Sequence, residues 1–187
     1  MGDEVSTVYA NENTHGWKRL YKLLPKYELG DTTLGLLAKR HFNAAQGHFE
    51  RALAANELGW ESWWGMGKLA RMDGRLKVGF ENLQRALALK GNGLEFYIDL
   101  TTFALELGQY SLAEQYGRTA VEYNPKDSEL LSLYAVALAM NKKSKRALGV
   151  ATNACKYDAN NSRTWSVLDL VKRIDRGEEE IPESIRF

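Results

Sequence analysis

The sequence has few of the features that mark several protein classes. It contains one cysteine among 187 residues, Cys155, so no disulfide framework is expected. It has three prolines and no apolar run near the roughly 18 residues that a membrane-spanning helix needs. Its start has neither the basic nor the apolar region of a signal peptide. We therefore expect a cytoplasmic protein without a membrane partner.

The charges nearly cancel, with 25 Lys and Arg against 24 Asp and Glu. A nucleic-acid-binding surface usually shows as an excess of basic residues, so no nucleic-acid partner is expected. One turn nevertheless carries four basic residues, which are Lys142, Lys143, Lys145 and Arg146. We interpret them as a solubilising turn, or as the rim of a contact with an acidic partner.

Groups of residues typical of catalysis or metal binding are also missing. His41 and His48 are seven residues apart, on opposite sides of a predicted turn between helices, with no other ligand at metal-binding spacing. The sequence contains no glycine-rich phosphate loop, no nucleophile elbow and no His-Glu-x-x-His motif. We therefore predict no catalytic residue, no metal and no cofactor, and hence no enzyme.

What the sequence does contain is a repeat of 34 residues. Small residues recur at this spacing, at Ala52, Ala86, Ala120 and Ala154. Bulky residues recur at the same spacing elsewhere in the repeat, at Leu29, Trp63, Tyr97, Leu131 and Trp165. Small residues allow two helices to approach closely, and bulky residues form an apolar stripe on the first helix of each pair. A repeat of this length predicts stacked helix pairs that share one core.

The stretch from Leu94 to Asp127 resembles the tetratricopeptide repeat (TPR) family. It carries the residues typical of that motif at Tyr97, Leu100, Ala104, Gly108, Tyr110, Ala113, Ala120 and Pro125. The resemblance extends to four units, at 26–59, 60–93, 94–127 and 128–161, although Lys142 stands where a turn glycine is usual. It implies an all-α, right-handed α-solenoid of about four TPR helix-turn-helix units with a C-terminal capping helix.

The segments outside the repeats are predicted to be caps and tails. Residues 14–25 are expected to form an N-terminal capping helix, because their apolar residues recur at helical spacing. Residues 162–176 are expected to form the C-terminal capping helix. The remaining segments, 1–13 and the acidic 177–187, show no periodicity and are predicted to be mobile tails.

The resemblance also implies where a partner binds, because the first helices of TPR units line a concave groove. The predicted groove residues are Trp64, Lys68, Arg71, Ile98, Thr102, Leu105, Val136 and Met140. They are mostly apolar, and they lack the Lys, Asn and Arg clamp with which some family members hold chaperone carboxylates. The expected function is a non-enzymatic scaffold or adaptor that binds a protein or peptide segment, with Trp64 as its main anchor.

Two alternatives stay open. The apolar groove residues could be buried inside the chain, covered by the twist of the solenoid or by a terminal tail. The C-terminal Ile181, Ile185 and Phe187 could also fill the groove of a second copy. That exchange would make the protein a self-associating structural assembly protein, a homo-oligomer built from TPR units.

Overall fold

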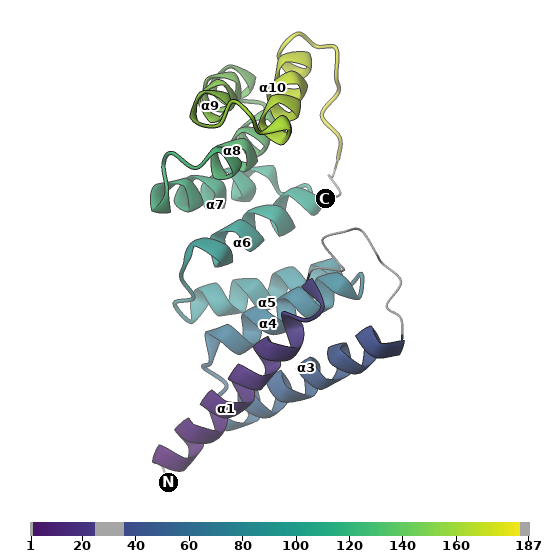
Figure 1. The fold of residues 1–187 in the computed structure, drawn as a ribbon, viewed down its shortest axis with the longest axis vertical. Coiled ribbons are helices and arrows are strands. Elements are labelled where there is room, and N and C mark those ends of the chain that lie inside the picture. Colours follow the sequence, from purple (N-terminus) through teal and green to yellow (C-terminus); the bar gives the residue numbers. More distant parts are fainter. Residues whose placement is uncertain (1, 25–35, 184–187) are drawn as a thin grey trace. The chain divides into compact units, whose positions relative to one another are not determined.

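A computed structural model describes residues 2–24 and 36–183, which form nine helices and no strand (Figure 1). The helices are α1 (Gly2–Leu20), α3 (Leu36–Ala55), α4 (Trp60–Met72), α5 (Leu76–Ala88), α6 (Leu94–Glu106), α7 (Tyr110–Tyr123), α8 (Ser128–Met140), α9 (Ser144–Tyr157) and α10 (Ser162–Asp175). This confirms the all-α fold. The chain divides into an N-terminal body (Met1–Gly91) and a C-terminal body (Asn92–Phe187), and each is described by itself.

Three helix pairs follow the 34-residue repeat, and the same turn joins the helices of each pair. The pairs are α4 with α5, α6 with α7, and α8 with α9. Gly74 and Gly108 occupy their turns with φ of 74° and 69°, in the left-handed region that favours glycine. Lys142 stands at the same place in the next turn, with φ of 61°. The turn geometry therefore repeats even where the glycine does not.

The recurring small residues are buried in the packed interior of the repeats. Ala86, Ala120 and Ala154 are at most 1% exposed. A side chain added at Gly67 would overlap Leu83 and would approach the carbonyl oxygen of Gly79 to 2.9 Å. Cys155 is 5% exposed beside Ala154, as expected for a small core residue. Close packing of this kind fixes which residues can recur at these positions.

The N-terminal body departs from the prediction at two places. Residues 2–13, predicted to be a mobile tail, belong to α1, which packs along α3. The turn predicted between His41 and His48 is also wrong, because α3 runs through both residues without a break. Residues 25–35, where the unit predicted at 26–59 begins, lie outside the described residues.

The N-terminal part of α1 is held by polar contacts, which explains why an apolar pattern did not reveal it. Glu12 accepts hydrogen bonds from His48 at 2.6 Å and from Arg51 at 3.0 Å, both on α3. Tyr9 donates a hydrogen bond to Glu61 of α4 at 2.7 Å. Hydrogen bonds from His48 and then from Arg51 lower the pKa of Glu12, so it stays charged at neutral pH.

In the C-terminal body, α10 covers the last repeat and the chain then turns back. The Asn161 side chain accepts a hydrogen bond from the backbone of Arg163 at 3.0 Å and so caps the start of α10. Leu168 and Val171 of α10 are buried against α8 and α9. Residues 178–183, predicted to be part of a mobile tail, contact other parts of this body, while residues 184–187 lie outside the described residues.

Candidate protein-binding surfaces

Three tryptophans meet where α1 and α4 pack in the N-terminal body. The Trp64 ring centroid lies 4.6 Å from that of Trp17 and 6.0 Å from that of Trp60. All three side chains are partly exposed. Stacked, partly exposed aromatic rings offer a large apolar contact area at low entropic cost. We call Trp17, Trp60 and Trp64 the tryptophan cluster.

Two glycines allow the helices to come close enough to form this cluster. A side chain at Gly65 would overlap the Phe49 ring, and one at Gly16 would come within 2.6 Å of it. Phe49 is fully buried, and its ring meets Trp17 edge-on at 5.7 Å. The Phe49 ring of α3 therefore fills the space that glycines leave on α1 and α4. The sequence prediction placed Trp17 in a cap and missed its role beside Trp64.

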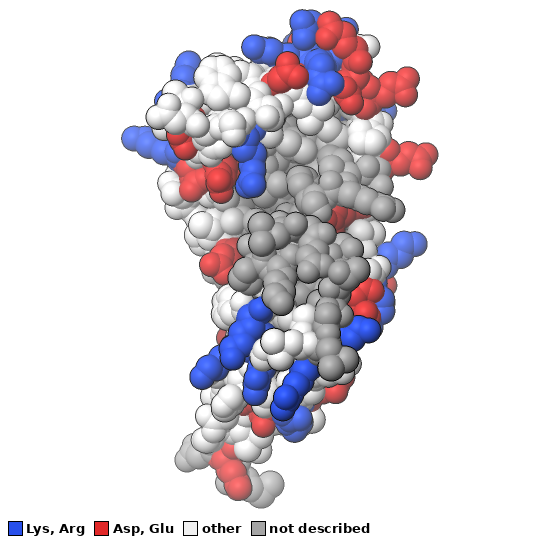
Figure 2. Space-filling view, turned by 45° about the vertical axis from the view of Figure 1, so that its right-hand side comes forward, with Lys and Arg blue, Asp and Glu red and all other residues white. Residues whose placement is uncertain are grey.

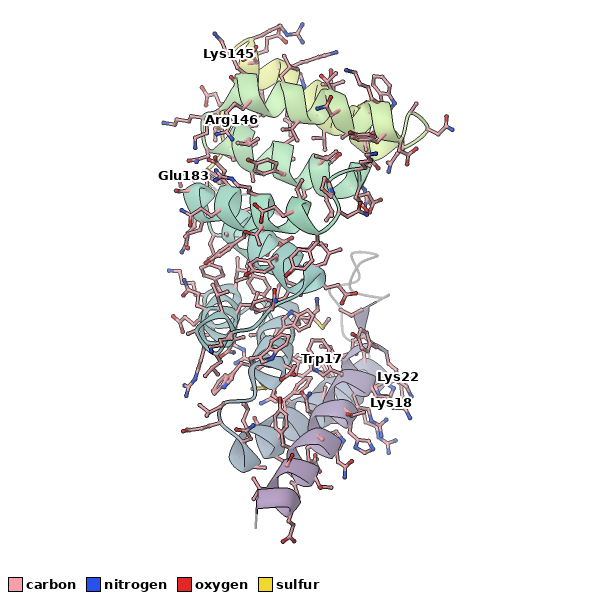
Figure 3. All side chains as sticks on the ribbon, turned by 90° about the vertical axis from the view of Figure 1, so that its left-hand side faces the viewer. Trp17, Lys18, Lys22, Lys145, Arg146 and Glu183 are labelled. Carbon is pink, nitrogen blue, oxygen red and sulfur yellow. The ribbon has the colours of Figure 1, made fainter. Side chains whose placement is uncertain are left out.

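Lys68 borders the tryptophan cluster, and further basic residues lie on other surfaces of the N-terminal body. The Lys68 ammonium group lies 5.7 Å from the centroid of the Trp64 ring, within range of a cation–π interaction. In Figure 3, Trp17 and the pair Lys18 and Lys22 point to opposite sides of α1. Lys and Arg side chains gather on the N-terminal body in Figure 2. The exposed ones include Lys18 and Arg19 on α1, Lys22 just after it, and Lys39 and Arg40 on α3.

The groove residues predicted in the C-terminal body fall into two groups. Ile98 and Thr102 are partly exposed on α6, and the Thr102 hydroxyl donates a hydrogen bond to the Ile98 carbonyl oxygen at 2.9 Å. Leu105, Val136 and Met140 are buried, with exposures of 0%, 6% and 2%. These three contribute to the core in this structure. Arg71 of the N-terminal body is partly exposed.

A buried glutamate explains part of the basic turn after α8. The Glu114 side chain is only 4% exposed, and it accepts hydrogen bonds from Lys143 at 2.5 Å and from Asn141 at 2.6 Å. Arg146 and Arg118 reach its other oxygen at 3.3 Å and 3.4 Å. Burial alone would raise the pKa of Glu114, but the bonds from Lys143 and Asn141 and the nearby positive charges outweigh burial and lower it. Lys143 and Arg146 of the basic turn thus neutralise the charge of Glu114. Lys142 and Lys145 of the same turn are exposed.

In the part of the chain that the structure describes, no three His, Cys, Asp or Glu side chains converge as a metal site. Within those residues, no helix combines the length and apolar character needed to cross a bilayer.

Helix pairs that recur every 34 residues, with a small residue between the helices, define an all-α helical-repeat protein. The sequence model of the tetratricopeptide repeat family matches residues 34–93 and 104–161. The chain therefore belongs to the tetratricopeptide repeat family. No curated protein matches it in sequence.

Solved structures with the same fold are distant in sequence. YrrB, described as a TPR protein with an unusual peptide-binding site, is 19% identical over 77% of this chain and 74% of its own, with a TM-score of 0.68. MamA AMB-1 is 16% identical over 98% and 89%, with a TM-score of 0.66. PilF of Pseudomonas aeruginosa is 14% identical over 89% and 72%, with a TM-score of 0.65. These likenesses concern the fold, and function has to be argued from the residues.

Proposed function

We propose that this chain is a non-enzymatic TPR scaffold or adaptor that binds a protein or peptide segment. The observation that carries this proposal is the partly exposed tryptophan cluster in the N-terminal body. Tryptophan is enriched among the residues that dominate binding energy at protein interfaces. The family supports the proposal in general terms, and the similar fold of YrrB, a protein with a peptide-binding site, is compatible with it.

The proposed contact residues are the partly exposed ones of the predicted groove, taken for each body by itself. They are Trp64, Lys68 and Arg71 in the N-terminal body, and Ile98 and Thr102 in the C-terminal body. Trp64 would receive an apolar side chain of the partner, and Lys68 beside its ring would favour an acidic neighbour on that segment. Leu105, Val136 and Met140 are assigned to the core because of their burial. A substitution at these three positions would test folding rather than binding.

The test is affinity capture from native extract with identification by mass spectrometry. Wild type is compared with Trp64→Ala and with Lys68→Glu, which changes the border of the cluster without removing an aromatic ring. Trp165→Ala is the matched control, because Trp165 is 49% exposed on α10 of the C-terminal body. Circular dichroism checks that each variant is folded.

We expect one set of proteins to be retained by wild type and by Trp165→Ala, and to be lost with both variants of the cluster. Retention of the same proteins by every folded variant would refute the role of the tryptophan cluster. Capture of the chain alone would instead favour the self-associating alternative. Light scattering over a concentration series then decides, because a constant monomer mass excludes that alternative.

A further inference from the structure

The residues after α10 return across the C-terminal body. Gly177 has φ of 72°, and the Glu178 backbone amide donates a hydrogen bond to the Arg173 carbonyl oxygen at 2.9 Å. These features end the helix and reverse the chain. In Figure 1 the segment runs from the end of α10 down towards the end of α6. We call residues 178–183 the return segment.

Two separate places on the C-terminal body hold the return segment. On α10, Arg173 donates a hydrogen bond to the Glu179 carboxylate at 2.7 Å. At the turn between α6 and α7, the Tyr110 hydroxyl donates a hydrogen bond to the Pro182 carbonyl oxygen. At the same turn, a side chain on Gly108 would overlap the carbonyl oxygen of Glu183, so this backbone passes directly over the glycine. The start of the return segment is therefore held by α10, and its end by the turn between α6 and α7.

The chemistry of these contacts selects a particular kind of segment. Arg173 binds the carboxylate side chain of Glu179. Tyr110 and Gly108 contact only backbone atoms of the segment, so they do not depend on which side chains stand there. Pro182 restricts the backbone before binding, which lowers the entropy lost on ordering the segment. Burial and then the charge of Glu183 raise the pKa of Tyr110, so its hydroxyl stays protonated and able to donate.

We propose that Gly108, Tyr110 and Arg173 form an acceptor site for an extended Glu-x-x-Pro segment. Residues 179–183 are its intramolecular ligand, and a protein partner that carries the same spacing competes with them for the site. This proposal goes beyond the tryptophan cluster and does not depend on it. A tethered ligand acts at an effective concentration on the order of millimolar, so the free site has to be uncovered before a separate peptide binds measurably.

The experiment uses the full chain, with substitutions that weaken the binding of its own return segment to the acceptor site. An open-site variant carries Glu179→Lys and Pro182→Ala, two changes in a segment that lies outside the helices. The probe is a fluorescent synthetic peptide with the sequence of residues 179–183, Glu-Glu-Ile-Pro-Glu, and binding is followed by fluorescence anisotropy. Arg173→Glu in the open-site background removes the acceptor. Arg176→Glu is the matched control, because Arg176 lies at the same helix end but pairs with Glu178, which the peptide lacks.

We expect the open-site variant to bind the peptide at least tenfold more tightly than wild type. In the open-site background, Arg173→Glu is expected to abolish this gain in affinity, and Arg176→Glu is expected to keep most of it. Trp64→Ala in the open-site background is expected to bind the peptide normally, which separates this test from that of the proposed function. The proposal is overturned if the open-site variant binds no more tightly than wild type. It is also overturned if Arg173→Glu and Arg176→Glu weaken binding equally, since a general charge effect would then explain the result.

Discussion

Replacing Glu114 by glutamine tests whether the buried carboxylate stabilises the C-terminal body. Its side chain is 4% exposed, and its two oxygens accept bonds from Lys143, Asn141 and two arginines. Glutamine keeps the shape and one acceptor oxygen, but it turns an NH₂ group towards cationic donors. Hydrogen bonds to a charged group contribute about 1.5–3 kcal/mol each. Because the cations are themselves 41–56% exposed, solvent recovers part of the loss, and we expect about 2 kcal/mol.

The pH dependence of this effect has a definite sign. The pKa of Glu114 is lowered in the folded chain, so its contribution is present above the ordinary carboxyl pKa of about 4.3 and is lost as the pH falls through the lowered value. Urea unfolding at pH 7 should show the glutamine variant as the less stable, and the difference should shrink below about pH 4. Glu122→Gln, an exposed glutamate on the same helix, is the control. Equal stability at pH 7, or a difference that persists at low pH, would show that the charge of Glu114 does not stabilise the fold.

Three further substitutions test the packing and the turns. Lys142→Gly should raise the free energy of unfolding by about 0.5–1 kcal/mol in urea, because φ of 61° is strained for a residue with a side chain; a decrease would contradict this. Gly65→Ala should cost about 1–3 kcal/mol in thermal unfolding because its side chain would overlap Phe49, whereas Gly149→Ala, with open space around it, should be neutral or stabilising. Leu105→Ala should cost about 2–5 kcal/mol by chemical denaturation, against little change for Leu58→Ala at a residue that is 64% exposed. A stable Leu105→Ala chain would show that Leu105 is not a core residue.

The repeat pattern predicted the helix pairs well because it records close packing. Alanines at 34-residue spacing mark buried positions that recur from unit to unit, so the pairs from α4 to α9 follow from the sequence. The N-terminal body was harder to predict because α1 is fixed there by Tyr9, Glu12 and other polar side chains. Polar contacts between distant residues leave no period in the sequence.

The candidate site was predictable in part, for a similar reason. A residue's position in the repeat indicates which helix face it occupies. This was enough to predict Trp64 and Lys68 as contact residues. The position does not indicate what covers that face, so Leu105 and Met140 were predicted as contacts although they are buried. The return segment was missed because Arg173, Tyr110 and Pro182 are far apart in the sequence and meet only through the fold.

Binding of a protein segment by the tryptophan cluster is tested by the affinity of one purified captured partner. Isothermal titration calorimetry would compare wild type, folded Trp64→Ala and the Trp165→Ala control. Loss of a central interface tryptophan costs about 2 kcal/mol or more, which corresponds to roughly 30-fold weaker binding. We predict that loss for Trp64→Ala and wild-type affinity for Trp165→Ala. Equal affinity for all three proteins would show that the tryptophan cluster is not the binding site.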